Sequence, residues 1–131
     1  MVYCNMLQEV YIGGGVTSIN KYAFGYCYSL ASITIPDGVT SINNATFRYC
    51  YSLASITIPY GVTSIGGGAF GDCYGMRYYD FSACTTIPAL SNTNAFDNIP
   101  ADCQMLIPSA LFDEWSAETK WATYASKMVA V

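Results

Sequence analysis

The sequence predicts an α/β repeat protein, a solenoid of stacked coils with short strands and short helical turns, and three observations lead to this prediction. Residues 30–52 (LASITIPDGVTSINNATFRYCYS) are followed at once by a second copy, residues 53–75 (LASITIPYGVTSIGGGAFGDCYG), and preceded by a third, residues 7–29 (LQEVYIGGGVTSINKYAFGYCYS). Four cysteines keep the same 23-residue interval: Cys4, Cys27, Cys50 and Cys73. Hydrophobic residues make up 53% of the 131 residues, which is ample for a core. Repetition at such a period is typical of solenoids, whose stacked units bury a core that no single unit could.

Each unit is expected to contain two strands. In the central copy, Ile33 and Ile35 alternate with Thr34, which is the period-two pattern of a half-buried strand. Residues 36–38 (Pro-Asp-Gly) form a turn, and residues 39–42 (Val-Thr-Ser-Ile) a second short alternation. Equivalent strands of successive coils are expected about 4.8 Å apart in a parallel sheet. One coil contributes seven inward side chains: Leu30, Ile33, Ile35, Val39, Ile42, Phe47 and Cys50.

The shared pattern L-x-x-I-T-I-P-x-G-V-T-S-I-x-x-x-A-F-x-x-C resembles the BspA-like leucine-rich repeat. The resemblance covers residues 7–75 and extends in degenerate form from Met76 onward. It implies a right-handed, curved leucine-rich-repeat solenoid, of the kind found in bacterial surface proteins and adhesins that bind host proteins or other cells. It implies no enzyme and no cofactor. Two positions depart from the pattern: Gly13 stands where the other copies have proline, and Thr46 where they have alanine.

We expect two parts along the chain. Residues 1–83 hold the leucine-rich repeats, namely a truncated first repeat, three full coils and the start of a degenerate fourth. Residues 84–131 hold the remainder of the degenerate repeat and a C-terminal capping segment, because the end of a solenoid needs a cap with a polar outer side. In the fourth coil, Tyr79 and Phe81 fall on the inward strand positions.

The fourth coil also carries extra residues. Aligning Ile87 with Ile42 places Cys84 at the inward position of Val39. The same alignment leaves residues 88–94 as an additional polar loop that is rich in turn-forming residues.

The C-terminal segment is expected to begin with a last strand over residues 103–108, in which Met105 and Ile107 point inward. A first helix then covers residues 109–115 and a second helix residues 116–128, each opened by a serine at its first position. Apolar residues at three- and four-residue spacing form one face of the two helices: Leu111, Trp115, Trp121, Tyr124 and Met128.

The repeat cysteines are expected to be buried, reduced thiols. Each lies three residues after a core phenylalanine, the spacing of one helical or 3₁₀ turn, where a small apolar thiol fills the interior. The pairs are Phe24 and Cys27, Phe47 and Cys50, and Phe70 and Cys73. Disulfides and metal binding are the alternatives, but the chain has no histidine and no C-x-x-C motif. Cys103 has no equivalent position in the repeat, so its redox state stays open.

Charge and hydropathy exclude two classes of partner. The net charge is −4, from five basic and nine acidic residues without a basic cluster, so nucleic acid is not an expected partner. No apolar run approaches the roughly 18 to 20 residues that span a bilayer, so membrane insertion is not expected. Only 11% of the residues are charged, so Tyr, Ser, Thr, Asn and Gly must form the surface.

The N-terminus falls inside a repeat, because Tyr3-Cys4 matches Tyr26-Cys27. We therefore expect the parent protein to begin earlier, and the absence of a secretion signal from this chain is uninformative. The resemblance implies an extracellular or cell-surface location. A coil cut in this way leaves an unpaired strand near residues 10–12, through which two chains are expected to form a homodimer.

Catalysis is not expected. The chain lacks histidine, which is the commonest general acid or base and the usual partner of a nucleophilic thiol. Asp113 and Glu114 are adjacent on a predicted helix and therefore diverge by roughly 100° instead of facing one substrate. The glycine runs 13–15 and 66–68 lack the following Lys-Ser/Thr of a phosphate loop and are interpreted as corners of the coil.

Two surfaces are candidates for binding a protein or glycan ligand. The outward strand residues are expected on the concave side: Glu9, Tyr11, Ser32, Thr34, Ser55, Thr57, Tyr78 and Asp80. Two rows of tyrosines flank the cysteines: Tyr3, Tyr26 and Tyr49 precede them, and Tyr28, Tyr51 and Tyr74 follow them. Tyrosine combined with Ser, Gly and Asn is typical of adaptable recognition surfaces. The alternative is that stacked tyrosines only cover the edges of the core.

Two functions from different classes follow. The first is a non-enzymatic protein-binding or cell-adhesion module of a bacterial surface protein, with an unidentified ligand. The second is a structural spacer or assembly segment, including one carried by a phage, with no ligand of its own. A signal peptide and wall anchor in the parent protein would favour the first function, and phage structural neighbours the second.

Overall fold

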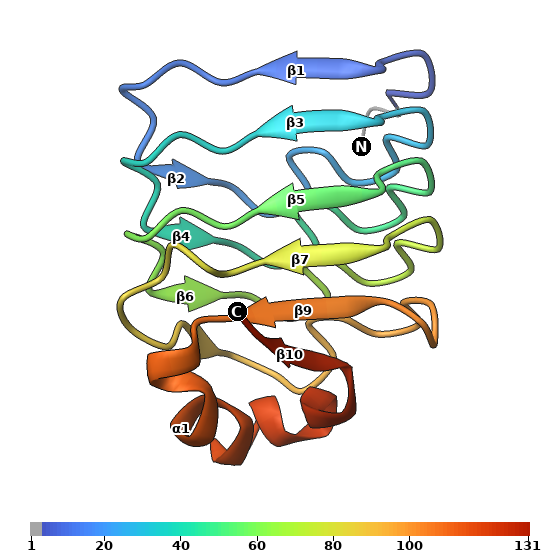
Figure 1. Ribbon diagram of the computed structural model, residues 1–131. Coiled ribbons are helices and arrows are strands. Elements are labelled where there is room, and N and C mark those ends of the chain that lie inside the picture. Colours follow the sequence, from blue (N-terminus) through green and yellow to red (C-terminus); the bar gives the residue numbers. More distant parts are fainter. Residues whose placement is uncertain (1–3) are drawn as a thin grey trace.

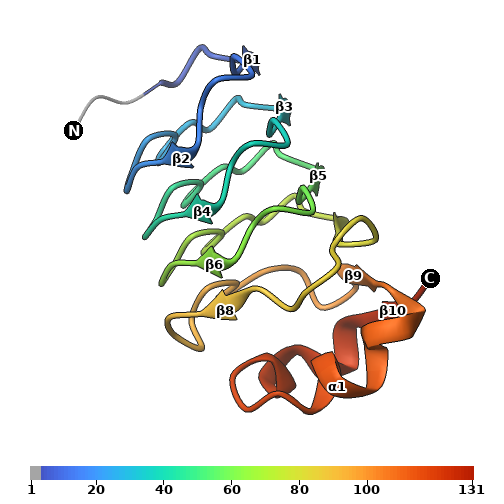
Figure 2. The same cartoon turned by 90° about the vertical axis from the view of Figure 1, so that its left-hand side faces the viewer.

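The computed structural model describes residues 4–131, and in it the chain winds through a stack of coils (Figure 1). Each repeat coil places one short strand on each of two faces (Figures 1 and 2). The first face carries β1 (Glu9–Tyr11), β3 (Ser32–Thr34), β5 (Ser55–Thr57), β7 (Tyr78–Asp80), β9 (Gln104–Ile107) and β10 (Met128–Ala130). The second face carries β2 (Ser18–Ile19), β4 (Ser41–Ile42), β6 (Ser64–Ile65) and β8 (Ala89–Leu90). The chain thus has the parallel strands and few helices of a leucine-rich-repeat fold.

Strand pairing follows the repeat. On the second face, β2, β4, β6 and β8 form one continuous parallel sheet, in which Ile19, Ile42, Ile65 and Leu90 are successive register partners. On the first face, β1 pairs with β3, and β5 pairs with β7, which is followed by β9 and β10. In the part of the chain that the structure describes, no hydrogen bond joins β3 to β5, so the first face consists of two separate sheets.

The core lies between the two faces, as the alternation of the strands predicts. All seven predicted inward side chains of the coil 30–52 are buried, and so are Tyr79 and Phe81 in the fourth coil. Four phenylalanine rings form a stacked column along the molecule, with centroids 5.6, 5.2 and 5.4 Å apart: Phe24, Phe47, Phe70 and Phe96. The 23-residue period therefore places like residues on top of one another, and each coil completes the core of the next.

The third side of each coil is a run of turns rather than the helical turn that the Phe-Cys spacing predicts. Bonds within a coil alternate with bonds between coils: the Gly25 N–H donates to the Tyr22 carbonyl (3.1 Å), and the Tyr26 N–H to the Arg48 carbonyl of the next coil (2.8 Å). Tyr26 and Tyr49 have φ of 63° and 61°, a left-handed conformation that a right-handed helix does not contain. The coils are thus also joined along this third side.

The fourth coil corrects the predicted alignment. β8 lies within residues 88–94, which were expected to form an extra loop, and Leu90 is the register partner of Ile65. The prediction that Ile87 takes the place of Ile42 is therefore wrong, since Leu90 takes it. Both residues are apolar and lie three apart, and only the pairing with β6 decides which of them belongs to the strand.

The position of Cys84 changes with this alignment. Cys84 does not take the place of Val39; it lies in the turn after β7, with its Sγ 3.8 Å from the carbonyl oxygen of Ile58. Its side chain is nevertheless buried, as predicted. The register partners show that two of the three residues added to this coil extend the connection between β7 and β8, since Ser64 pairs with Ala89, 25 residues later, and Tyr78 with Gln104, 26 residues later.

The C-terminal segment contains more elements than the predicted pair of helices. They are the 3₁₀ turn η1 (Ser109–Leu111), the helix α1 (Phe112–Ala117), the 3₁₀ helix η2 (Trp121–Lys127) and the unpredicted strand β10. Ser109 does not cap a helix, because its hydroxyl donates to the carbonyl of Val131 (2.7 Å). Ser116 lies within α1 instead of opening a second helix. Glu118, which ends α1, supports the start of η2, since its Oε2 accepts the N–H groups of Lys120 and Trp121 at 3.0 Å each.

Aromatic side chains join this segment to the repeats. Trp115 and Trp121 meet the ring of Phe81 edge-on, at centroid distances of 5.3 and 5.4 Å. The Trp121 indole N–H also donates to the carbonyl of Pro88 at 2.7 Å. The spacing predicts an apolar face of five residues. Leu111 is half-buried, and the other four members are buried: Trp115, Trp121, Tyr124 and Met128.

Candidate binding surfaces

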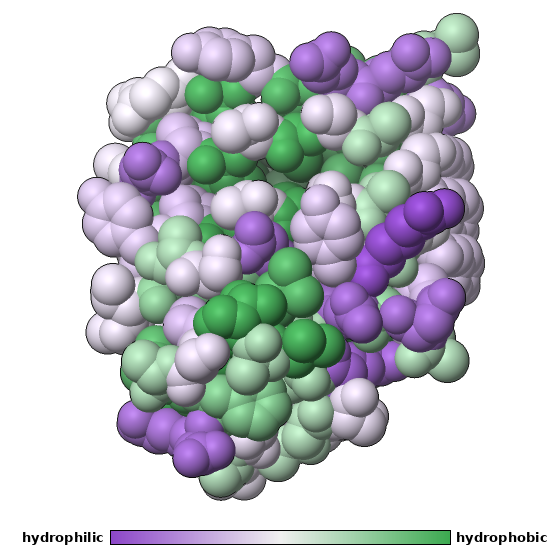
Figure 3. Space-filling view, in the orientation of Figure 1, coloured by the Kyte–Doolittle hydropathy of each residue, from purple (hydrophilic) through white to green (hydrophobic). Residues whose placement is uncertain are grey.

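The outward side chains of the first face form two rows, because parallel strands in register align equivalent positions. The first row is Glu9, Ser32, Ser55, Tyr78 and Gln104, and the second is Tyr11, Thr34, Thr57 and Asp80. Figure 3 shows this face, with pale, weakly polar side chains lying over green apolar ones. Tyr11 is 90% exposed, Ser55 and Asp80 are half-buried, and the other predicted strand-face residues are exposed. The sequence thus predicts correctly which residues share this face.

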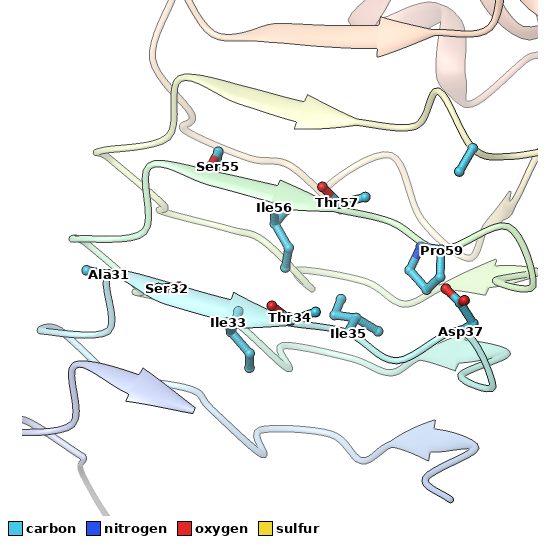
Figure 4. A pocket seen from close by; sticks show the side chains of 11 residues that line it. Ala31, Ser32, Ile33, Thr34, Ile35, Asp37, Ser55, Ile56, Thr57 and Pro59 are labelled. Carbon is cyan, nitrogen blue, oxygen red and sulfur yellow. The ribbon is translucent and has the colours of Figure 1, made fainter. Parts of the chain in front are cut away.

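The gap between β3 and β5 forms a cavity of about 380 Å³ on the same face (Figure 4). Ile33 and Ile56 line it from the two strands, with Thr34 and Thr57 beside them. The carboxylate of Asp37 lies in the turn that follows β3 and is the charged member of the lining. Sequence reasoning missed this cavity, because β3 and β5 have identical Ser-Ile-Thr sequences and nothing local indicates that they separate.

The predicted tyrosine rows are present for the members that the structure describes; Tyr3 lies outside the described residues. Rings of one row stack along the molecule, with Tyr28 and Tyr51 4.8 Å apart and Tyr51 and Tyr74 5.1 Å apart, each pair at 12°. In the other row, Tyr26 and Tyr49 lie 4.7 Å apart. The ring faces are therefore largely turned toward one another.

A polar cluster ends the row of Tyr26 and Tyr49. Asp72 occupies the equivalent position of the next coil and is 5% exposed. Its carboxylate accepts hydrogen bonds from Arg48 Nε (3.3 Å), Asn98 Nδ2 (2.9 Å) and the Tyr74 hydroxyl (3.2 Å). The sequence signal for this cluster is the aspartate at a repeat position where the two preceding coils have tyrosine, and the repeat pattern alone does not reveal its partners.

The Arg48 side chain links this cluster to the tyrosine rows, since its guanidinium carbon lies 5.0 Å from the centroid of the Tyr49 ring. Arg48, Asp72 and Asn98 thus form one connected network with two tyrosines, Tyr49 and Tyr74.

The cysteines are free thiols in the described chain, and the predicted burial of Cys27, Cys50 and Cys73 is confirmed. Sγ of Cys50 and Sγ of Cys73 each lie 3.2 Å from a carbonyl oxygen of the preceding coil. Burial raises the pKa of Cys27 and of Cys73 from 9.0 to about 12, and that of Cys84 and Cys103 to about 11. Such thiols are protonated at neutral pH and are poor nucleophiles.

Residues 4–131 contain no cluster of three or more His, Cys, Asp or Glu side chains that could hold a metal ion. None of the helices found in that range is long and apolar enough to cross a membrane.

Comparison with known proteins links the repeat pattern to a family. A family model described as "BspA type Leucine rich repeat region" matches residues 2–104 in six copies. No curated protein matches the chain.

Two of the solved structures that are similar to it are bacterial leucine-rich repeat proteins. A leucine-rich repeat protein from Bacteroides ovatus ATCC 8483 is 30% identical over 80% of this chain, with a TM-score of 0.45. A leucine rich cell surface protein from Faecalibacterium prausnitzii A2-165 is 19% identical over 82% of this chain, with a TM-score of 0.38. The matched regions span 34% and 55% of those two chains, respectively.

Proposed function

The chain belongs to the BspA-type leucine-rich repeat family, and from this membership we propose that it is a non-enzymatic protein-binding module of a bacterial cell-surface protein. The proposal places ligand binding on the strand face and the parent protein at the cell surface. It includes a right-handed, curved solenoid, a division near residues 83 and 84, and a capping role for the C-terminal segment. A glycan is the alternative ligand.

The observation that carries this proposal is the contrast between the two candidate surfaces. The tyrosine rings of the rows pack on one another, and Tyr74 also donates to Asp72. On the strand face, by contrast, the side chains of Tyr11, Thr34 and Thr57 make no hydrogen bond to any described residue. Exposed groups that the fold does not use are available to a partner, so the strand face is the better candidate.

The chemistry of the strand face suits recognition of a protein. Tyrosine provides rigid contact area with a hydrogen-bonding end, and serine and threonine provide hydrogen bonds that adapt to different partners. Tyr11 and Tyr78 lie at opposite ends of the repeats and are both exposed, so a partner that contacts both covers the whole face. The scarcity of charge also lowers the cost of removing water from this surface.

Two double variants test where a ligand binds. In a screen against host matrix proteins and glycans, we expect a ligand whose affinity falls by about 2 kcal/mol or more in Tyr11→Ala/Tyr78→Ala, the usual effect of a binding hot spot. Tyr26→Ala/Tyr49→Ala is the matched variant in the tyrosine rows, and we expect it to retain the affinity. Melting curves of both variants separate lost binding from lost stability. Unchanged affinity in the strand-face variant would exclude this surface.

A structural spacer is the second candidate function. The repetition of the core residues between residues 30–52 and 53–75 favours it, because a spacer needs only repeated core positions and no particular surface. The screen also separates the two functions, since a spacer without a ligand of its own binds no member of the panel.

A further inference from the structure

The opening between β3 and β5 is a local departure from the regular stacking of the coils. The Arg77 N–H donates to the Ala54 carbonyl (2.7 Å), and the Ile58 N–H donates to the Asp80 carbonyl (2.9 Å), which joins the third and fourth coils. One coil earlier, the equivalent donors are Ala54 and Ile35. Among the described residues, neither of these two N–H groups bonds to the preceding or following strand of this face.

The same two coils are fully joined elsewhere. On the second face the Thr63 N–H donates to the Thr40 carbonyl (2.8 Å), and on the third side the Phe47 N–H donates to the Ala69 carbonyl (2.8 Å). The coils are therefore held together on the second face and on the third side, and they are open on the first face. The opening thus has the character of a fixed groove rather than of a break in the molecule.

The lining of the groove combines three kinds of group. Its apolar floor is formed by the isoleucines of both strands, including Ile33 and Ile56, which are at most 7% exposed. Hydroxyl groups of Thr34 and Thr57 lie along it, and Asp37 lies near one end (Figure 4). The two facing strand edges add main-chain N–H and C=O groups without strand partners. The volume of about 380 Å³ is within the usual range of roughly 300 to 1,000 Å³ for ligand pockets.

We propose that this groove binds an extended peptide segment of the partner protein. β3 and β5 stay closer together than the roughly 9.6 Å that a third strand between them would need. The peptide therefore lies across the outside of the opening, where the hydroxyl groups of Thr34 and Thr57 can bond to its main chain. An aliphatic side chain of the peptide lies on the isoleucine floor, and a basic side chain pairs with Asp37. No aromatic ring lines the groove, so the stacking surface that sugars commonly require is missing. The inference rests on the proposed function and names the part of the partner that is recognised.

The test uses a phage-displayed library of random heptapeptides, selected on the intact 131-residue chain. Selected peptides are expected to contain an aliphatic residue and a lysine or arginine. Synthetic copies with N-methyl groups at alternate residues, which cannot donate the main-chain hydrogen bonds, should bind at least tenfold more weakly. The substitution Asp37→Asn should lower the affinity for peptides that contain the basic residue several-fold. It should leave unchanged the affinity for peptides in which a neutral residue replaces the basic one.

A disulfide across the groove gives the sharpest variant. Ser32→Cys/Ser55→Cys joins positions one repeat apart on β3 and β5, and closing the gap should reduce peptide binding at least tenfold. Asp80→Cys/Leu106→Cys is the matched control, because it joins register partners on the already paired β7 and β9 and leaves the groove open. The control disulfide can form without moving the strands, because register partners in a sheet lie within the Cα distance that a disulfide bridges. Mass spectrometry verifies both bonds.

Hydrogen exchange provides an independent measurement of the groove. The amides of Ala54 and Ile35 should exchange much faster than those of Arg77 and Ile58, and a selected peptide should slow them. Failure to select any peptide, or equal affinity for the closed and control variants, would overturn the groove proposal. If a host protein still binds through Tyr11 and Tyr78, the proposed function stands without the groove; if no protein binds either, both are wrong.

Discussion

Cys27, Cys50 and Cys73 occupy one position of successive coils, and burial determines their chemistry. Removal from water disfavours the thiolate, so the pKa of Cys27 and of Cys73 rises to about 12. At neutral pH the native protein therefore holds these groups as thiols. A thiol reagent at pH 8 should modify them slowly in the native protein and rapidly in denaturant. Rapid native modification would contradict the buried cysteine column.

The same shift predicts instability at alkaline pH. Thiols ionise near pH 9.0 in the unfolded chain and near pH 12 in the native protein, so the unfolded state releases protons first as the pH rises. Stability is fully present below pH 9 and is lost progressively toward pH 12. Melting temperatures under reducing conditions should thus fall from pH 9 upward. The fall between pH 9 and 10 should be smaller in Cys73→Ala, and an equal fall would contradict the assignment.

Phe47 is the residue whose loss should cost most in the repeats. Its ring is fully buried and lies between those of Phe24 and Phe70 at 5.6 and 5.2 Å. Phe47→Ala removes both contacts and leaves a cavity, so the free energy of unfolding should fall by about 3 to 5 kcal/mol. Tyr11→Ala, at a 90% exposed residue, is the control and should cost under about 0.5 kcal/mol. Denaturant unfolding measures both changes.

Among the elements, the C-terminal segment is the one that the repeat pattern does not describe. Its strand β10 pairs in parallel with β9, so the edge of the larger sheet on the first face is extended beyond the last coil. Its two tryptophans cover Phe81, and its Tyr124 packs edge-on against Phe96 at 5.2 Å. The segment therefore pairs with the edge of β9 and contacts the rings of Phe81 and Phe96, and these contacts support the capping role proposed above.

Deletion of residues 109–131 should consequently yield an aggregated or loosely packed protein. The deletion exposes the edge of β9 together with the apolar surfaces of Phe81 and Phe96, and unpaired strand edges promote association. Light scattering and the cooperativity of thermal melting report the outcome. A monomeric truncated chain that melts cooperatively would show that the repeats are stable without this segment.

Across the whole molecule, burial increases from the first coil to the second. Leu7, Val10 and Ile12 are only partly buried, whereas their equivalents one repeat later, such as Leu30 and Ile33, are buried. The residue types are similar, so the difference is the lack of a described strand on the outer side of β1. We propose that two chains pair through this end, which leaves the apolar surface covered and the strand edge bonded.

Addition of a copy of residues 30–52 before Leu7 should raise the melting temperature and abolish the pairing of chains. The added coil covers the same apolar surface. It also presents a new outer strand edge, so charged residues are placed on that strand to prevent two chains from pairing there. Light scattering compares the association state of the extended chain with that of the original chain, and thermal melting compares their stability. An identical association state would show that the first coil does not cause it.

The sequence by itself determined the repeat, and in the three full coils it determined the strand positions and the inward side chains. A fixed 23-residue period forces equivalent residues into register, and alternation within a strand then decides which of them are buried, as Ile33 and Phe47 show. It also indicated which residues share the strand face, because outward positions follow from the same alternation. Whether these residues bind a ligand remains a prediction.

Only the tertiary structure decided the features that depend on contacts between coils. Ile87 and Leu90 are equally suited to a strand, and pairing with β6 selects Leu90. The carboxylate of Asp72 is bonded by side chains from the coils on both sides, a contact that no local pattern encodes. The strands β3 and β5 have the same sequence, and both pair in parallel with a neighbour on the side away from the other: β3 pairs with β1, and β5 pairs with β7. The groove between them therefore arises from how whole coils stack, which is a property of the assembled molecule and not of any one repeat.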